Sequence, residues 1–312
     1  MKEVFVADAH CDTAGEMYRK FNLYKSKGHF DLERLSRYSG YLQVFAIWVD
    51  PKKETDFIKK RFYEITDNLA LQQKENKDIF FLAKSKADIE YSLKNYKYTG
   101  LISVEGGEIL GDDESFIDVL YEKGVRGLTL TWNYKNNIGC GAGCEVDTGL
   151  SEFGKRVVKK LDEKGILIDL SHASEKTFWD ACDCSDNVMV THSNAKKLCS
   201  HKRNITDEQI KHLIKAGGFA GVNYYPFFLK ENGKANISDV IKHIEYFLAL
   251  GAEDILGLGS DFDGMDIIAD GIDGAQSVYK IADELLKLNY SENCVKKIMG
   301  ENLVNFLVKR LK

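Results

Sequence analysis

Short apolar runs alternate with longer amphipathic segments along the 312 residues of this chain. Most of the short runs are continuously apolar, which is typical of parallel strands that are covered on both faces. This alternation constrains the fold strongly, because it requires a parallel sheet with helices packed outside it. The predicted strands are Val4–His10, Leu42–Val49, Gly100–Glu105, Val125–Trp132, Ile166–His172, Asn187–His192, Phe219–Tyr225 and Ile255–Asp261.

The segments between these strands have the spacing of amphipathic helices. Two of them begin with capping residues, since Ser174 follows the fifth strand and Thr206–Gln209 matches a capping box. The predicted helices are Lys53–Lys74, Asp113–Lys123, Gly149–Lys164, Ser174–Cys184, Thr206–Ala216 and Ile237–Leu250, followed by two closing helices at Ser277–Leu288 and Ser291–Lys309.

Eight strands that alternate with helices, with no break in composition, predict one α/β domain over residues 1–312, a (β/α)8 TIM barrel with long βα loops. A doubly wound sheet that binds a dinucleotide would need a glycine-rich loop after the first strand, and this chain has His-Cys-Asp-Thr there. The glycine-rich segment from Asn133 to Gly149 is expected to be one of the long loops that build a barrel active site.

Composition excludes several classes of protein. The formal net charge is −5 and no tract of Lys and Arg is present, so we expect no nucleic-acid partner. No apolar stretch reaches the length of a membrane span, and the apolar run near the N-terminus is too short for a signal peptide. Seven cysteines without an export signal predict reduced thiols and a cytoplasmic protein.

Ionisable residues close the apolar runs at their C-terminal ends, which is the face where barrel active sites form. Burying an ionisable group costs roughly several kcal/mol of folding free energy unless the group is paired, hydrogen-bonded or bound to a metal ion. Imidazoles and carboxylates that meet at one end of a barrel suit a dication such as Zn²⁺. The residues concerned are His10, Asp12, Glu105, His172, His192 and Asp261.

The spacing of these residues indicates how they would share metal ions. His10 and Asp12 are two residues apart on a strand, so both side chains point to the same side and can bind one ion. Glu105 has two oxygens and can bridge two ions, and His172 and His192 come from neighbouring strands. Two ions could hold a hydroxide between them as nucleophile, which leaves Asp261 as general base and then acid.

The remaining four histidines, His29, His201, His212 and His243, lie in predicted helices or loops, and we expect them to be structural. Asp8 and Asp263 are expected to support the site from outside or to shape a turn.

Six motifs in order resemble the membrane dipeptidase (renal dipeptidase) family, peptidase family M19, which belongs to the amidohydrolase-like metal-dependent barrels. The resemblance covers nearly the whole chain, as far as Gly300-Glu-Asn302. The motifs are His10-Cys-Asp12, Val104-Glu105-Gly106-Gly107, Asp169-Leu-Ser-His172, Thr191-His192-Ser193, Arg203-Asn204 and Gly259-Ser-Asp261-Phe-Asp263-Gly264.

The resemblance implies a dipeptidase with two zinc ions per chain, in which Glu105 bridges the ion of His10 and Asp12 and the ion of His172 and His192. It also implies that Arg203 binds the C-terminal carboxylate of a dipeptide, a role that suits a planar guanidinium. Asp261 would be the acid and base and would contact the free amino group. Tyr225 is expected to line the same substrate pocket.

The chain departs from the better-known members of the family at the end of the fourth strand. Those members have a His there, thought to stabilise the tetrahedral intermediate, and this chain has Trp132 and Asn133. Either an indole N–H or the Asn133 amide would have to donate to the oxyanion, or this contribution is weaker. The fourth strand also lacks a terminal Lys, which leaves the bridging role to Glu105. The animal enzymes are exported and lipid-anchored, and this chain shows neither signal.

We therefore predict a cytoplasmic zinc dipeptidase that hydrolyses small dipeptides and makes no membrane contact. Mn²⁺ or Co²⁺ also suits a mixed His and carboxylate site, and a homodimer is possible for an enzyme of this kind. Two alternatives stay open: another amidohydrolase chemistry, such as a lactonase, a deaminase or a hydrolase of N-acyl amino acids, and a barrel that binds small molecules without catalysis.

Overall fold

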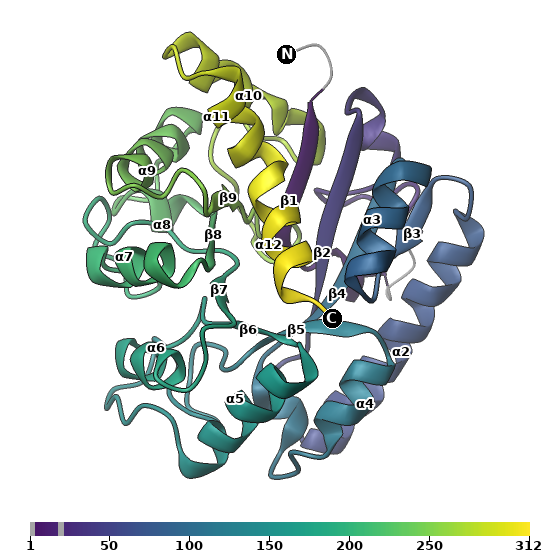
Figure 1. The fold of residues 1–312 in the computed structure, drawn as a ribbon, viewed down its shortest axis with the longest axis vertical. Coiled ribbons are helices and arrows are strands. Elements are labelled where there is room, and N and C mark those ends of the chain that lie inside the picture. The colour runs from purple at the N-terminus through teal and green to yellow at the C-terminus, as the bar shows by residue number, and fades with distance from the viewer. Residues whose placement is uncertain (1–3, 18–21) are drawn as a thin grey trace.

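A barrel of eight parallel strands with helices around it forms the protein, as seen in a computed structural model that describes residues 4–17 and 22–312 (Figure 1). The strands pair in the order β2-β1-β9-β8-β7-β6-β5-β4, and pairing of β2 with β4 closes the ring. The predicted TIM-barrel fold is confirmed. The barrel strands are β1 (Phe5–Cys11), β2 (Gly40–Trp48), β4 (Tyr98–Glu105), β5 (Val125–Thr129), β6 (Leu167–Asp169), β7 (Val188–Val190), β8 (Phe219–Val222) and β9 (Leu256–Leu258).

Several elements were not predicted from the sequence, among them a strand and a helix between β2 and β4. Strand β3 (Phe80–Leu82) pairs with the first half of β4, and helix α3 (Lys86–Asn95) follows it, capped by the Ser85 hydroxyl. Strand β3 lies outside the closed ring of eight strands, so the alternation expected of a (β/α)8 barrel left no place for it.

The helices confirm the predicted alternation, with small shifts at their ends. Those on the outside of the barrel are α2 (Thr55–Glu75), α4 (Phe116–Glu122), α5 (Glu152–Lys164), α6 (Glu175–Cys182), α7 (Asp207–Ala216), α9 (Ile237–Ala249) and α10 (Tyr279–Lys287), and the shorter helices α1 (Thr13–Met17) and α8 (Pro226–Leu229) follow β1 and β8.

The last predicted helix is divided into α11 (Glu292–Lys296), a π-helical turn (Lys297–Glu301) and α12 (Asn302–Arg310). The turn brings Gly300 so close to β1 that an added Cβ would lie 2.8 Å from the Ala7 amide nitrogen. Side chains of α12, among them Leu303 and Phe306, pack with Ala7 and Ala9 in one buried cluster. Helix α12 therefore covers one end of the barrel, and the carboxyl ends of the strands lie at the other (Figure 1).

Five of the strands, β5 to β9, end two or three residues earlier than predicted, and side chains take over backbone hydrogen bonds beyond their carboxyl ends. The Ser171 amide donates to Asp169 Oδ1 (3.0 Å), and the Tyr225 amide donates to Asn223 Oδ1 (2.5 Å). His172, His192, Tyr225 and Asp261 consequently lie on the loops that follow the strands and not on the strands themselves.

Candidate active site

A cavity of about 1040 Å³ lies at the carboxyl ends of the strands. Its walls bring together residues that are far apart in the sequence, from the segments after β1 and β2, the ends of β2 and β4, and the loops after β5 to β9. Eight of the ten residues predicted for the site line this cavity, namely Asp12, Glu105, Trp132, Asn133, His172, Arg203, Tyr225 and Asp261. His10 and His192 are buried directly behind this surface.

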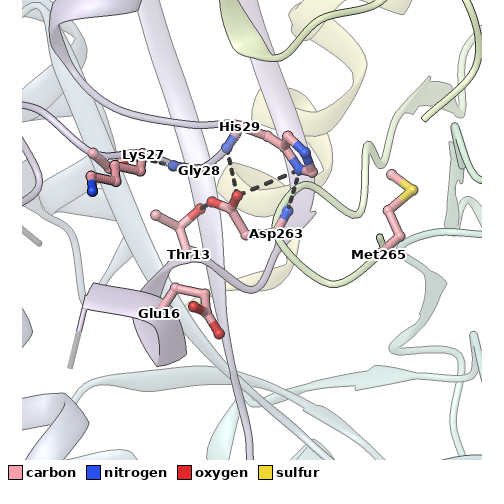
Figure 2. A pocket seen from close by; sticks show the side chains of 8 residues that line it. Thr13, Glu16, Lys27, Gly28, His29, Asp263 and Met265 are labelled. Carbon is pink, nitrogen blue, oxygen red and sulfur yellow. Dashed lines mark hydrogen bonds and ion pairs between the residues drawn. The ribbon is translucent and has the colours of Figure 1, made fainter. Parts of the chain in front are cut away.

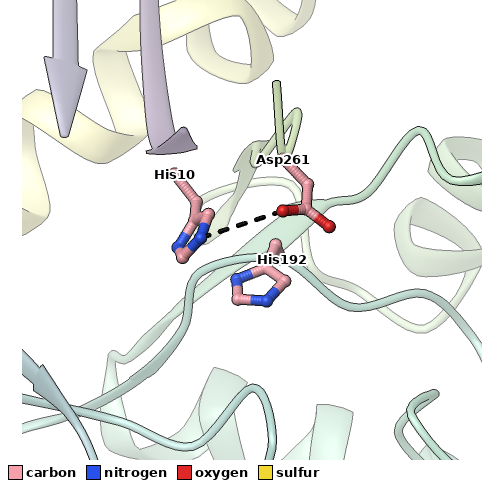
Figure 3. A group of neighbouring side chains, drawn as sticks. All are labelled: His10, His192 and Asp261. Atoms are coloured by element: carbon pink, nitrogen blue, oxygen red, sulfur yellow. Dashed lines mark ion pairs between the residues drawn. The ribbon is translucent and has the colours of Figure 1, made fainter. Parts of the chain in front are cut away.

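His10 lies at the centre of a group of carboxylates. Its Nε2 atom is 3.4 Å from Asp12 Oδ2, 3.6 Å from Glu105 Oε2 and 3.8 Å from Asp261 Oδ1. Figure 3 shows the approach of His10 and Asp261, with the ring of His192 beside them. The rings of His10 and His192 are 3.9 Å apart between centroids.

His172 and His192 form a second group around the other oxygen of Glu105. Glu105 Oε1 is 2.7 Å from His172 Nε2 and 3.8 Å from His192 Nε2. The two Nε2 atoms are themselves only 2.9 Å apart. Glu105 thus contributes one oxygen to each group, which is the arrangement that a bridging carboxylate needs.

The hydrogen bonds behind these two rings fix their tautomers. His172 Nδ1 lies 3.0 Å from Asn133 Oδ1, which can only accept, so this nitrogen carries the proton. His192 Nδ1 lies 2.8 Å from Thr191 Oγ1, whose own hydrogen is donated to Asp169, so His192 Nδ1 also donates. Both Nε2 lone pairs then face each other and a carboxylate oxygen, an arrangement that calls for a cation between them.

The ligand chemistry of the whole cluster also fits a metal ion. Among the described residues there are three sets that could each hold an ion. Within each set the possible donor atoms lie within 4.8 Å of one another, and most of the residues are buried. His10 Nε2 has no hydrogen-bond partner among the described residues although it is buried. Two imidazoles with free Nε2 atoms, beside carboxylate oxygens, suit a borderline dication. The sets are His10, Asp12 and Glu105; Glu105, His172 and His192; and His10, His192 and Asp261.

Burial and mutual charge shift the pKa values of these groups in different directions. Burial and the nearby Glu105 raise the pKa of Asp12 to about 7. Burial opposes a charge on His10, but Glu105 and Asp12 outweigh it and hold the His10 pKa well above its usual value. Burial lowers the pKa of His172 to about 4 and that of His192 well below its usual value. Burial opposes the charge on Glu105 too, yet the adjacent histidines keep its pKa low.

Asp169 organises the strand ends behind His172 and His192. Its carboxylate accepts hydrogen bonds from the hydroxyls of Thr129 (2.6 Å), Ser171 (2.6 Å) and Thr191 (2.8 Å), and from two backbone amides. Because Asp169 is buried, these bonds hold three successive strands in register. The sequence contained Asp169 in a motif but gave no sign of this role.

Asp8 performs a comparable task on the opposite side of the barrel. Its Oδ1 atom accepts from the amides of His10 (3.1 Å) and Ser260 (3.0 Å), which joins the ends of β1 and β9. Asp261 follows with a left-handed backbone (φ 64°), and its Oδ2 atom accepts from Asn223 Nδ2 at 3.0 Å. The expectation that Asp8 supports the site from outside therefore agrees with its contacts.

Arg203 is a buried cation whose donors are largely unused. Nη1 reaches Ser193 Oγ at 3.4 Å, while Nε and Nη2 have no hydrogen-bond partner in the described part of the chain. Burial lowers the pKa of Arg203 to about 10, against the attraction of Asp261 and Glu105. A charged guanidinium with free donors on the wall of a cavity is suited to bind an anion.

Trp132 and Asn133 lie on the wall next to His172. The indole of Trp132 stacks over the His172 ring (6.2 Å between centroids, 25° between planes) and contacts Trp48. The Asn133 carbonyl oxygen is engaged by His172 Nδ1. Asn133 thus orients a histidine, a role that the sequence did not predict.

Another part of the cavity wall is aromatic. Tyr225 and Phe228 pack edge to face at 4.9 Å, and the guanidinium of Arg203 lies over Phe228 at 5.4 Å. His201, which was expected to be structural, also lines the cavity and contacts Phe228.

The family model for membrane dipeptidase (peptidase family M19) matches residues 1–309. The dipeptidase tcpJ of Claviceps purpurea is 30% identical over 294 residues, which cover 90% of this chain and 69% of the relative.

Solved structures share the fold closely. A metallo peptidase from Rhodobacter sphaeroides, solved with a phosphinate mimic of the dipeptide L-Ala-D-Ala, superposes with a TM-score of 0.90 at 23% identity, covering 99% of this chain and 100% of that one. An amidohydrolase from Pseudomonas aeruginosa superposes with a TM-score of 0.81 at 25% identity, over 97% and 95% of the two chains.

Despite the family's name, none of the helices in residues 4–17 and 22–312 is long and apolar enough to cross a membrane. The full-length family match and the relative at 30% identity agree with the barrel and with its buried cluster of histidines and carboxylates. This chain is a member of the membrane dipeptidase family, peptidase family M19, and hence a metallo-dipeptidase, a hydrolase.

Proposed function

We propose that the protein hydrolyses the peptide bond of free dipeptides with two metal ions, zinc being the favoured metal. One ion would be held by His10, Asp12 and Glu105, and the other by Glu105, His172 and His192. The observation that carries the proposal is the pair of Nε2 lone pairs 2.9 Å apart beside Glu105. The two separate oxygen contacts of Glu105 support its role as the bridge.

When bound, paired ions supply a nucleophile at neutral pH and polarise the carbonyl of the scissile bond. The protein's own groups orient the substrate and move protons. Asp261 is the proposed acid and base, since it lines the cavity 3.8 Å from His10 Nε2, and burial and Glu105 raise its pKa. It would accept a proton from the attacking water and give it to the departing amine.

The substrate would be recognised at both ends. Arg203 has free donors for the C-terminal carboxylate, and Asp261 offers a carboxylate oxygen to the amino group at the other end. A longer peptide cannot satisfy both contacts with its terminal charges, and burying an unpaired charge is costly. The dipeptide mimic bound by the Rhodobacter sphaeroides relative is consistent with a substrate of this size.

The wall at Trp132 limits how the oxyanion could be stabilised. The Oδ1 atom of Asn133 is engaged with His172, so the Asn133 Nδ2 amide and the Trp132 indole N–H are the candidate donors from this loop. Stabilisation of the tetrahedral intermediate would otherwise rest on the ions.

Metal analysis and a substrate panel test the proposal together. The purified protein should retain close to two zinc ions per chain and hydrolyse dipeptides much faster than the matching tripeptides. Loading with Mn²⁺ or Co²⁺ should also restore activity. Equal turnover of tripeptides would contradict recognition of both ends, and one ion per chain would contradict the paired site.

We further propose that the chain acts as one domain in a reducing compartment such as the cytoplasm. Its seven cysteines are all free thiols, and its largest buried cluster includes residues from Val4 to Met299. A homodimer is a prediction that light scattering can check.

A further inference from the structure

Asp263 joins three segments beside the carboxylates of the cluster, and its own side chain is only 4% exposed. Its Oδ2 atom accepts from the Thr13 hydroxyl at 2.6 Å, and its Oδ1 atom accepts from the His29 amide at 2.5 Å. The Asp263 amide in turn donates to His29 Nδ1 at 3.1 Å. Figure 2 shows this carboxylate between Thr13 and His29 at the side of a small pocket.

The loop around His29 is shaped to receive this carboxylate. A Cβ atom on Gly28 would overlap Asp263 Oδ1, so a side chain at this position would displace the carboxylate. Thr13 follows Asp12 directly, and the Asp12 amide donates to the Phe262 carbonyl at 2.8 Å. The Asp263 carboxylate therefore holds the end of β1 and the turn after β9 at a fixed separation.

Gly264 marks how closely the two carboxylates of the site approach this turn. A Cβ atom there would overlap Asp12 Oδ2 and would lie 2.5 Å from Asp261 Oδ1. The Gly264 backbone is not left-handed, so its conformation alone does not require glycine. What requires glycine is the space that Asp12 and Asp261 occupy.

We propose that Asp263 is a positioning residue that, together with Gly264, sets the separation between Asp12, a proposed ligand of the ion that His10 binds, and Asp261, the proposed acid and base. The inference rests on the proposed two-metal function and adds to it the device that assembles one of the two ion sites. Asp263 is not a member of either proposed ligand set. It acts through Thr13 and through its own turn.

The test measures zinc affinity with a chromophoric chelator for the wild-type protein and for Asp263→Ala. We expect the variant to keep the ion of His172 and His192 and to bind the other ion about 10–100-fold more weakly, as for other partners that orient a ligand. Asp263→Asn keeps one acceptor oxygen and should fall between the two. Thr13→Val removes one of the two donors and should also be intermediate.

Asp31→Ala is the matched control, because Asp31 is a buried carboxylate that anchors the same loop through Ser26 and Arg34 but lies outside the ion sites. It should lower the melting temperature of the metal-free protein and leave both zinc affinities unchanged. Should Asp263→Ala fail to fold, Gly264→Ala probes the same separation and should weaken the same ion.

Two results would overturn the inference: wild-type affinity for both ions in Asp263→Ala or Gly264→Ala, or an equal loss at both ions. Wild-type protein that binds fewer than two zinc ions would instead overturn the proposed function, and the inference with it.

Discussion

The two halves of the metal cluster are built in different ways. We call His172 and His192 the imidazole half, and His10, Asp12 and Asp261 the carboxylate half; Glu105 belongs to both. His172 and His192 follow the neighbouring strands β6 and β7, and hydrogen bonds to the buried Asp169 carboxylate join the ends of these strands. The carboxylate half spans the ends of β1 and β9, and its turn has left-handed residues at Asp261 and Asp263.

This difference indicates that the halves have different tasks. Imidazoles whose pKa values are lowered by burial are neutral at pH 7 and ready to bind an ion. In the carboxylate half, Asp12 and His10 both hold protons more tightly than usual. An ion there must displace those protons. We infer that the imidazole half is the tighter ion site and the carboxylate half the place where protons move.

The largest effect is expected from Glu105→Gln, because this residue serves both halves. An amide in place of the carboxylate removes the charge that pairs both ions, so zinc content and activity should both fall. The loss should exceed the roughly 10–100-fold that partners outside the ligand set cost. Metal analysis and dipeptide turnover check this, with Glu114→Gln, which removes an exposed carboxylate that pairs with Arg156, as control. Loss of only one ion would show that Glu105 does not bridge.

Asp261→Asn should separate chemistry from ion binding. We expect kcat to fall by about 10²–10⁴-fold, the range for a lost general acid or base, while the imidazole half keeps its ion. Steady-state kinetics on a dipeptide and metal analysis of the same sample measure both. Full activity in this variant would remove Asp261 from the mechanism.

Asn133→Ala should affect the imidazole half in particular. It removes the acceptor that keeps the proton on His172 Nδ1, so zinc affinity in that half should fall by roughly 10-fold or more. Chelator competition measures it, and Asn137→Ala, which removes an exposed side chain that donates to the Gly111 carbonyl, is the control. Weaker zinc binding in the carboxylate half, with unchanged zinc binding in the imidazole half, would contradict the assignment of Asn133 to His172.

The smallest effect is expected from pH. Below pH 7 protons compete both for Asp12, whose pKa is about 7, and for His10, whose pKa is held above its usual value, so affinity in the carboxylate half should weaken by at least about tenfold per pH unit. The imidazole half should change little until the pH approaches 4, the pKa of His172. Zinc titrations at several pH values test this contrast, which equal slopes for the two ions would contradict.

Much of the barrel could be predicted from the sequence, because continuous apolar runs such as Leu42–Val49 are typical of buried parallel strands. The same runs placed the site at one end of the barrel. Strand β3 was not predicted, since it lies outside the closed ring and the pattern of eight alternating strands does not require it. Strand ends were placed too late where Asp169 and Asn223 replace sheet hydrogen bonds with side-chain ones.

The supporting contacts of the site could not be predicted for a related reason. A bond such as Thr13 to Asp263 joins residues 250 positions apart, and only the closed barrel brings them together. Sequence spacing paired His10 with Asp12 because they are two residues apart in the chain, at the end of β1. It could not show that Asn133 orients His172, because a loop conformation decides that contact.

The contact between the ends of β1 and β9 joins residues from the two ends of the chain, so the parts of the site are made at different times during synthesis. The proposed ligands of both ions, from His10 to His192, have all been synthesised when the chain reaches residue 192, whereas Asp261 is made much later. Because synthesis and folding start from the N-terminus, a nascent chain has its proposed metal ligands before it has its proposed acid and base. The half-made protein would thus have the groups that hold metal before it has the group that cuts a peptide.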